Sequence, residues 1–345
     1  MDATRFGMRQ RPAGLVSVCA LAALLAAIPA LTTSKAAAAE DAPAGVVTLA
    51  AYTTPREAYE EIISMFQATP MGAAVDFETS YSGSGDQSRA VEAGLPADVV
   101  ALSLWPDIDR LVAPGIVAPD WWQNDYAGIV HDSIVVFAVR PGNPKGIADW
   151  PDLIREDVDV ITPNPFTSGG AQWNLLAAYQ AQIVAGRSED EARAYLKALI
   201  ANTSVMDRSA REALTTFAAG QGDVLIAYEN EAIFAQQAGQ PLEYVVPEGT
   251  ILIENPVAVT LTGDAPVAAA AFVDFLYTPE AQAVFGRKGY RPVIAEVLAQ
   301  FEYAQPSNLF TIADMGGWPE ARPRFFDPGS GIVAEIFGEL GRDAA

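Results

Sequence analysis

Short apolar runs alternate with longer segments whose apolar residues recur every three or four positions. The runs at 46–52, 98–102 and 223–227 are typical of strands that are buried on both faces of a parallel sheet. Between such runs, segments like 56–66 place apolar residues at the three- and four-residue steps of an amphipathic helix. This alternation predicts an α/β fold in which mostly parallel sheets are flanked by helices.

Two further β-rich runs, at 133–139 and 255–260, are candidates for strands that cross between two lobes. A chain of 345 residues is long enough for more than one compact part. We therefore expect a discontinuous first lobe, made of residues 40–135 and 255–345. Residues 136–254 would form the second lobe.

Residues 1–39 carry the pattern of a secretory signal peptide. Three arginines lie before residue 12, an apolar run follows at 13–31, and four alanines at 36–39 precede two acids. The pattern predicts cleavage after Ala39 and a periplasmic or otherwise extracytoplasmic location, and an uncleaved membrane anchor is the alternative. Cys19, the one cysteine of the sequence, lies in the apolar run. The exported chain is therefore expected to have neither a disulfide nor thiol chemistry.

The sequence is acidic, with 21 basic and 43 acidic side chains and a formal net charge of −22. Loss of residues 1–39 would remove four of the basic side chains and one of the acidic ones, which leaves a net charge of about −25. Such a charge disfavours binding to nucleic acid or to anionic membranes. The acids are scattered along the chain, so we expect no metal site and no cofactor.

The stretch 167–174, Thr-Ser-Gly-Gly-Ala-Gln-Trp-Asn, stands where a predicted strand at 158–162 gives way to a predicted helix. Two consecutive glycines let a ligand approach the backbone closely. The first N–H groups of a helix have no partner within the helix, so the pattern fits an anion site made of backbone groups. An ordinary helix start with a serine N-cap is the simpler alternative.

Four predicted helix starts share a hydroxyl or glycine turn directly after a strand, at 53–55, 84–85, 168–170 and 209–210. Capping-box spacing occurs at three of them, in the pairs Thr54 with Glu57, Ser84 with Gln87, and Ser209 with Glu212. Each helix N-terminus is equivalent to about half a positive charge, so three that converge would supply roughly +1.5 without any Lys or Arg. The spacing does not decide whether these starts meet or point to different places.

Several short motifs occur in an order that is specific when they are taken together. They are Ser-Gly-Ser-Gly at 82–85, Asn-Pro-Lys-Gly at 143–146, Ile-Thr-Pro-Asn-Pro at 161–165, Thr-Ser-Gly-Gly at 167–170, Gly-Asp-Val-Leu at 222–225, Glu-Asn-Glu at 229–231, Leu-Phe-Thr-Ile at 309–312 and Gly-Gly-Trp at 316–318. With these motifs, nearly the whole exported chain resembles the periplasmic sulfate- and thiosulfate-binding proteins of ABC importers. The resemblance implies a two-lobe, type II binding-protein fold that closes over a dehydrated oxyanion and delivers it to a membrane permease. We expect a monomer that catalyses no reaction.

In that family, backbone N–H groups and neutral side chains hold the anion. Position by position, the resemblance implies the donors Thr53, Ser84, Ser168, Gly169, Gly170, Ala210 and Tyr228. Thr53 replaces an aspartate that acts through its backbone. Tyr228 replaces a tryptophan that donates its indole N–H, and a phenol has a different reach. Asp86 stands where many relatives have a lysine, and it is read as a solvated acid at a helix start or as an acceptor for the proton of hydrogen phosphate.

Other ligands and one other class of protein stay open as alternatives. The same fold could bind phosphate, molybdate or thiosulfate. A secreted hydrolase is disfavoured because Gly-Ser-Gly at 83–85 lacks the Gly-x-Ser-x-Gly spacing of a nucleophile elbow. The single histidine, His131, is expected at the surface beside Asp132. A ferric site made of Tyr52, Tyr81 and Tyr228 is a further alternative, although packing and hydrogen bonding are the roles expected for these tyrosines.

Overall fold

The alternation of strands and helices is present in the computed structural model, which describes residues 43–342. The predicted signal peptide at 1–39 and its cleavage site lie outside the described residues. Within 43–342, no helix combines the length and the apolar character needed to cross a membrane.

The described strands form one sheet with two parallel sets at its ends. Their order is β2-β1-β3-β9-β4-β7-β5-β6, with β10 and β8 paired to β4 and β11 paired to β9. The strand bounds are β1 Ala44–Tyr52, β2 Ala74–Ser82, β3 Val99–Ala101, β4 Ile129–Val139, β5 Val160–Ile161, β6 Thr203–Val205, β7 Val224–Tyr228, β8 Glu243–Val245, β9 Gly249–Val259, β10 Arg291–Pro292 and β11 Asn308–Phe310.

Two long strands connect the parallel sets. Strand β9 pairs antiparallel with β3 of the first set, and β4 pairs antiparallel with β7 of the second set. β4 and β9 also pair with each other, with Ser133 opposite Ile253. These strands contain the two β-rich runs that were predicted to cross between lobes. The lobe boundaries stay a prediction, because residues 41–345 group as a single compact unit.

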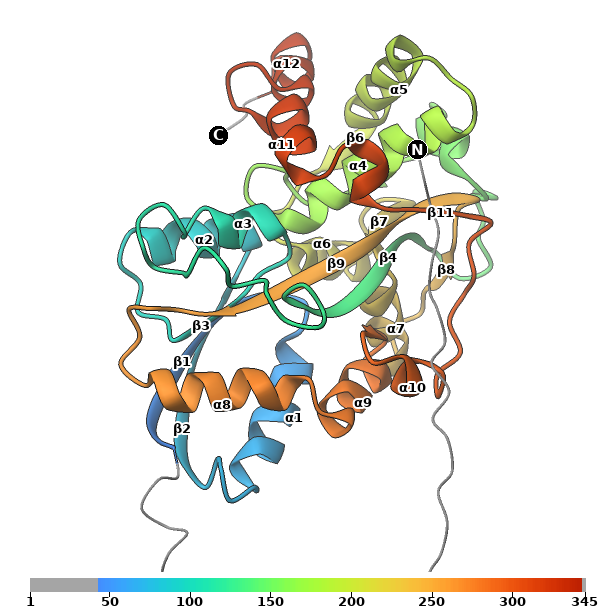
Figure 1. Cartoon of the computed structure of the whole chain (residues 1–345). Helices are drawn as coiled ribbons and strands as arrows, with labels where there is room; N and C mark the ends of the chain where they lie inside the picture. Colours follow the sequence, from blue (N-terminus) through green and yellow to red (C-terminus); the bar gives the residue numbers. More distant parts are fainter. Residues whose placement is uncertain (1–42, 343–345) are drawn as a thin grey trace, which may run out of the picture. The chain divides into compact units, whose positions relative to one another are not determined.

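Helices cover both faces of the sheet. Figure 1 shows α1, α8 and α9 on one side of β4 and β9, with α4 and α5 on the other. The helix bounds are α1 Arg56–Gln67, α2 Ser84–Glu92, α3 Trp105–Asp109, α4 Gly169–Val184, α5 Glu189–Ala201, α6 Ala210–Ala218, α7 Glu229–Gln237, α8 Pro266–Leu276, α9 Pro279–Arg287, α10 Ala295–Leu298, α11 Trp318–Phe326 and α12 Ile332–Glu339, with 3-10 turns at Trp150–Ile154 and Ile312–Met315.

The buried residues of these elements match the apolar pattern of the sequence. In α1 the buried residues Ala58, Ile62 and Phe66 recur at four-residue steps, which places them on one face of the helix. Strand β4 is almost wholly buried, and every side chain from 134 to 139 is at most 1% exposed. Burial on both faces explains its continuous apolar sequence. The interior therefore runs through the crossing strands and links the two parallel sets.

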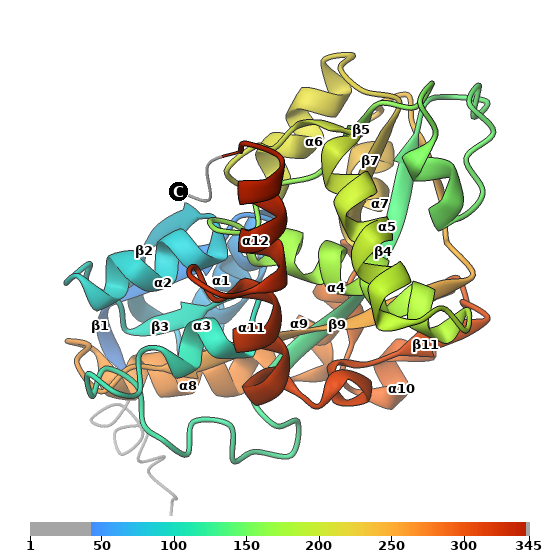
Figure 2. The ribbon, with the colours of Figure 1, turned by 90° about the horizontal axis from the view of Figure 1, so that it is seen from above.

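The C-terminal helices touch both parts of the fold. Helix α11 contacts α3, and α12 contacts α5, and Figure 2 shows the pair lying between the helices of the two strand sets. The indole rings of Trp318 and Trp173 pack edge to face with centroids 4.8 Å apart. In addition, the Arg193 guanidinium pairs with Glu339 at 2.6 Å. That the last part of the chain wraps two lobes, as the resemblance to the binding-protein family implies, stays a prediction.

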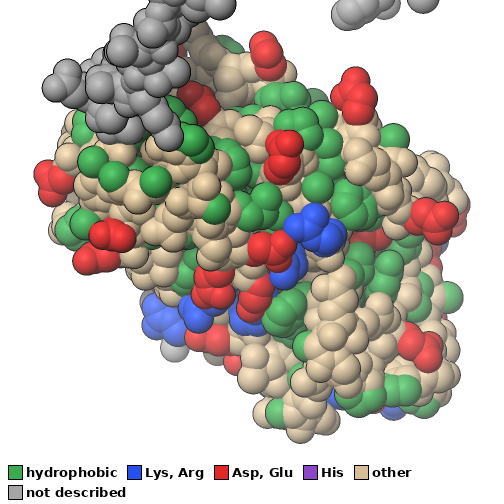
Figure 3. Space-filling view, turned by 90° about the horizontal axis from the view of Figure 1, so that it is seen from below, with side chains coloured by type: hydrophobic (Ala, Val, Ile, Leu, Met, Phe, Trp, Pro, Cys, Tyr) green, Lys and Arg blue, Asp and Glu red, His purple; other side chains and the backbone are tan. Residues whose placement is uncertain are grey.

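Basic side chains are kept beside acidic ones. On the face seen in Figure 3, the few Lys and Arg side chains lie next to Asp and Glu. Among the ion pairs of the described residues, Arg287 and Lys288 both pair with Glu61, at 2.6 and 2.9 Å. The basic residues on this face therefore form no positive patch.

Candidate functional site

Five helices, α1, α2, α4, α6 and α7, begin around one small cavity. Its lining residues are Tyr52, Thr53, Thr54, Gly83, Ser84, Ser103, Ser168, Gly169, Gly170, Ala210 and Tyr228. All seven residues that the sequence pointed to are among them, so the structure brings the predicted donors together. The cavity is narrow, with a volume of about 10 Å³, which is about the room that one water molecule needs.

The strand-to-helix order of the fold places these residues at the carboxyl ends of both parallel sets. β1 ends at Tyr52 just before α1, β2 ends at Ser82 just before α2, and Tyr228 ends β7 where α7 begins. Helices α4 and α6 start after β5 and β6 in the same way. Within each set the strands run parallel, so their carboxyl ends and the helix N-termini that follow lie on the same edge of that set. The two sets run in opposite directions, because β3, β9, β4 and β7 pair antiparallel in turn, and residues from the carboxyl ends of both sets line the cavity. The unpartnered first N–H groups of several helices are thereby concentrated around one point.

Two positions beside the cavity require glycine, because atoms of other segments lie close to the backbone there. A Cβ at Gly83 would lie 2.6 Å from the Thr167 carbonyl oxygen, and a Cβ at Gly169 would lie 2.7 Å from the Ser103 hydroxyl oxygen. Neither position has room for a side chain. The short Gly-containing turns therefore let elements of the two strand sets meet at the cavity.

The Ser84 hydroxyl is committed to a buried carboxylate. Its Oγ donates to Asp107 Oδ2 at 2.6 Å and accepts the Ser103 N–H at 2.9 Å. Burial raises the pKa of the Asp107 carboxyl, while the nearby Arg322 guanidinium and the Ser84 hydrogen bond act in the opposite direction. Since a hydroxyl has one proton, Ser84 can offer a ligand only its backbone N–H.

The Tyr228 hydroxyl is held by a residue that the sequence did not single out. Tyr228 OH and Ser103 Oγ lie 2.6 Å apart, and both residues are buried. Burial raises the pKa of the Tyr228 hydroxyl, so the phenol keeps its proton at neutral pH. The one available signal for Ser103 was a lone hydroxyl in the apolar run 99–104.

Ser168 and its neighbours present different groups. The Ser168 N–H donates to the Asn164 carbonyl at 2.9 Å, and its side chain does not cap α4. The Thr167 carbonyl accepts the N–H groups of Gly85 and Asp86, at 3.1 and 3.4 Å. Ser168 can therefore offer its hydroxyl to a ligand, while Thr167 ties the start of α2 to the turn before α4.

Two of the three predicted capping boxes are wrong. In α1 and α2 no side chain caps the helix, because Thr54 and Ser84 bind distant partners instead. The Thr54 hydroxyl lies 2.9 Å from Tyr290 OH, and Ser84 donates to the carboxylate described above. The third box, between Ser209 and Glu212 at the start of α6, is confirmed.

Charged groups stand behind or beside the cavity. Among the described residues that line it, none carries a charge at neutral pH. Next to Ala210, the Arg211 guanidinium pairs with Glu57 at 2.6 Å and with the buried Glu231 at 2.9 Å, and it also donates to the Thr54 carbonyl. Neutral groups therefore separate the cavity from the charged side chains around it.

Asp86 is an ion-paired residue instead of a freely solvated acid. Its carboxylate lies 2.6 Å from Arg89 and 2.7 Å from Arg208, and its side chain is 17% exposed. It does not line the cavity. The pair with Arg208 joins α2 to the turn before α6, so Asp86 holds the two sides of the site together.

The surface location predicted for His131 is wrong. His131 is fully buried on β4, where its ring packs within 4.5 Å of the Phe285 ring centroid and 4.1 Å of the Tyr290 ring centroid. Burial lowers its pKa from 6.5 to about 3. The prediction failed because β10 and α9 cover this strand, which the local sequence around His131 does not indicate.

In the described part of the chain, no group of three or more His, Cys, Asp or Glu side chains could hold a metal ion. Of the tyrosines considered for a ferric site, Tyr52 and Tyr228 line the cavity and Tyr81 does not.

Comparison with known proteins agrees with this geometry. A profile of the bacterial extracellular solute-binding proteins matches residues 47–291. The sulfate-binding protein of Synechococcus elongatus is 43% identical over 297 residues, which cover 82% of this chain and 84% of that protein. The thiosulfate-binding protein of Escherichia coli is 37% identical over 271 residues, 75% of this chain and 80% of the relative.

A solved structure is similar over the same region. The sulfate-binding protein SubI from Mycobacterium tuberculosis superimposes with a TM-score of 0.79 at 45% sequence identity, and the match covers 82% of this chain and 99% of that one. Because the family profile spans most of the chain and these relatives share well over 30% of its residues, this chain belongs to the bacterial extracellular solute-binding proteins.

Proposed function

We propose that this protein captures sulfate in the cavity and delivers it to the membrane permease of an ABC importer, without chemical change to the anion. The observation that carries the proposal is that several helix starts and neutral donors line one small cavity. Relatives named as sulfate-binding proteins, at 40–43% identity, support the choice of ligand.

Neutral donors suit a dianion that must be bound and later released. Each helix N-terminus contributes about half a positive charge at close range, so the starts of α1, α2, α4 and α6 offset the charge of sulfate. The protein's own negative charge acts through solvent, where salt screens it over about 8 Å. An acidic protein can therefore hold an anion that touches only N–H and O–H groups.

The hydrogen bonds around the cavity support a role for each donor. Thr53, Ser84, Gly169, Gly170 and Ala210 would give backbone N–H groups, since the Ser84 hydroxyl is already used. Ser168 would give its hydroxyl, since its N–H is already used. Tyr228 would give its phenol. All of these donors are uncharged, as the resemblance implies.

Sulfate is favoured over hydrogen phosphate because no carboxylate lines the described cavity to accept the phosphate proton. Hydrogen phosphate carries a proton that needs a partner when it is buried. The described residues that line the cavity include no carboxylate, and the Asp86 carboxylate is engaged by two arginines. Thiosulfate is the second candidate, because the thiosulfate-binding protein of Escherichia coli is also a relative.

The family is extracellular by description, and the proposed role requires export. We propose that residues 1–39 act as a cleaved signal peptide and that the exported protein works as a monomer in solution. A single size-exclusion measurement of the exported protein, with N-terminal sequencing, tests both statements.

Calorimetry of the purified exported protein tests the function. The protein is dialysed free of sulfate and titrated with sulfate, thiosulfate, phosphate and molybdate at neutral pH. Five heavy atoms at about −1.5 kcal/mol each set a scale of roughly −7.5 kcal/mol, so sulfate should bind with a micromolar or tighter dissociation constant. Phosphate should bind at least about tenfold more weakly. Absence of heat with sulfate would overturn the proposal.

A further inference from the structure

We propose that Ser103 is a further binding residue of the cavity, where it acts with Tyr228 as one shared hydrogen-bond donor to the anion. The inference rests on the proposed function, since it concerns the same anion. Its basis is the contact between the two hydroxyl oxygens, 2.6 Å apart, in residues that both line the cavity.

The pair joins the two strand sets at the centre of the site. Ser103 follows β3 of the first set, and Tyr228 ends β7 of the second set. The backbone of Ser103 is anchored, because its carbonyl accepts from the Trp173 indole and the Asn255 amide, each at 3.0 Å, and its N–H donates to Ser84 Oγ at 2.9 Å. The position of the Ser103 backbone is therefore set by the fold.

Both members of the pair lie against the two-glycine turn. A Cβ at Gly169 would come within 2.7 Å of Ser103 Oγ, and a Cβ at Gly170 would come within 3.4 Å of a Tyr228 ring carbon. The two hydroxyl-bearing residues thus flank the backbone segment whose N–H groups are proposed to hold the anion. An anion bound at this turn lies beside both of them.

Two hydroxyls carry two protons, and their mutual hydrogen bond uses only one. If Tyr228 donates to Ser103, the Ser103 proton is free, and if Ser103 donates to Tyr228, the phenol proton is free. A fully ionised oxyanion accepts whichever proton remains. The bond to the anion is favoured, because hydrogen bonds to charged groups are about twice as strong as those between neutral groups.

The shared donor makes each hydroxyl replaceable by the other. In Ser103→Ala the phenol turns its proton to the anion, and in Tyr228→Phe the serine does so. Either single variant should weaken sulfate binding by no more than about threefold. Ser103→Ala combined with Tyr228→Phe removes both hydroxyls of the pair and should weaken binding by about tenfold to a hundredfold.

A double-mutant cycle measured by calorimetry with sulfate tests this arrangement. Tyr290→Phe is the matched control, since it removes a phenol from another buried hydroxyl pair, with Thr54, while Tyr290 does not line the cavity. The control should bind sulfate like the wild type, and thermal unfolding should show that each variant folds.

Three results would overturn the proposal. If Tyr228→Phe alone loses as much affinity as the double variant while Ser103→Ala loses none, Tyr228 is the only donor of the pair. If Ser103→Ala alone loses it all, the roles are reversed. If the double variant binds like the wild type, neither hydroxyl touches the anion. A wild-type protein that binds no sulfate would instead overturn the proposed function.

Discussion

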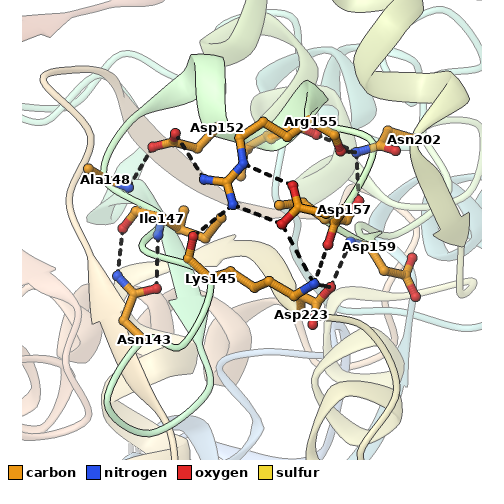
Figure 4. A network of polar contacts seen from close by, with 12 residues as sticks. Asn143, Lys145, Ile147, Ala148, Asp152, Arg155, Asp157, Asp159, Asn202 and Asp223 are labelled. Carbon is orange, nitrogen blue, oxygen red and sulfur yellow. Dashed lines mark hydrogen bonds and ion pairs between the residues drawn. The ribbon is translucent and has the colours of Figure 1, made fainter.

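The cavity and the polar network around Lys145 use polar side chains in opposite ways. The cavity, at the carboxyl ends of the parallel strands, is lined by neutral groups. The network lies where β5 and β7 begin, and there the Lys145 ammonium contacts Asp157 and Asp223 while Arg155 contacts Asp152 and Asp157 (Figure 4). The lining of the cavity is thus free of formal charge, whereas the network at the start of β5 and β7 is built from charged side chains.

The difference follows from access to water. Side chains in the network are 25–62% exposed, so solvent and salt screen each ion pair and its contribution is at most about 1 kcal/mol. At the buried cavity an unpaired cation would lose its hydration at a cost of several kcal/mol, whereas hydroxyl and amide groups lose less. Charged side chains are therefore found in an exposed loop, and neutral donors line the buried cavity in which we propose that the anion binds.

The largest effect expected is on the neutral region, from Gly170→Ala. The new methyl group would meet Tyr228, Ala210 and the Ser168 hydroxyl at 3.4–3.5 Å. These distances are tolerable for folding, but all three neighbours line the cavity, so the methyl would occupy the space of the anion. We expect sulfate affinity to fall by about 100-fold while the melting temperature is kept.

Gly338→Ala in α12 is the control for this change. A Cβ at Gly338 meets nothing within 4 Å, and alanine should stabilise the helix by about 0.5–1 kcal/mol with unchanged affinity. Calorimetry and thermal unfolding of both variants make the comparison. Wild-type affinity in Gly170→Ala would mean that the anion is not held at the two-glycine turn.

The second prediction concerns the protonation of His131, whose buried ring we expect to be uncharged like the lining of the cavity. In the folded protein this ring stays neutral down to a pKa of about 3, while the unfolded chain takes up its proton near pH 6.5. The unfolded state therefore binds more protons between these values, and stability is lost as the pH falls through that window. The loss is about 1.4 kcal/mol for each pH unit, or about 2 kcal/mol at pH 5.

Urea unfolding of the wild type and of His131→Gln between pH 7 and 4 measures this contribution. Subtracting the two curves removes the opposite slope of the neighbouring Asp132, whose pKa burial raises to about 8, because that residue is present in both proteins. Parallel curves would show that His131 takes up its proton in the folded state as well. The uncharged region around the cavity would then not include His131.

The smallest effect is expected in the charged network, from Lys145→Met. The variant loses the contacts of the ammonium with Asp157 and Asp223, and the free energy of unfolding should fall by at most about 1 kcal/mol. In 1 M NaCl, where the screening length is about 3 Å, the difference should shrink further. Sulfate affinity should not change. A clear loss of affinity would show that the two regions are coupled.

The sequence allowed the donors to be predicted but not their convergence. Each helix start carries a local signal, such as the Gly169-Gly170 pair after a strand, and local signals are readable from order and spacing. Their meeting depends on the crossing strands β4 and β9, which set how the two parallel sets face each other. That arrangement is a long-range property of the sheet, and the role of each residue in binding stays a prediction.

The errors share the same physical origin. Thr54 and Ser84 have the spacing of helix caps, yet their hydroxyls bind Tyr290 and Asp107, which are far away in sequence. Ser103 carries no motif, and its importance comes from a contact with a residue 125 positions later. In each case a tertiary hydrogen bond outweighs the local preference of the side chain.

A crystal structure of the exported protein with sulfate tests the central claim most directly. The account predicts sulfate in the cavity, with its oxygens about 2.7–3.2 Å from the backbone nitrogens of Gly169, Gly170 and Ala210 and with no Lys or Arg side chain in contact. Sulfate bound instead against Arg89 or Arg208 outside the cavity would contradict it.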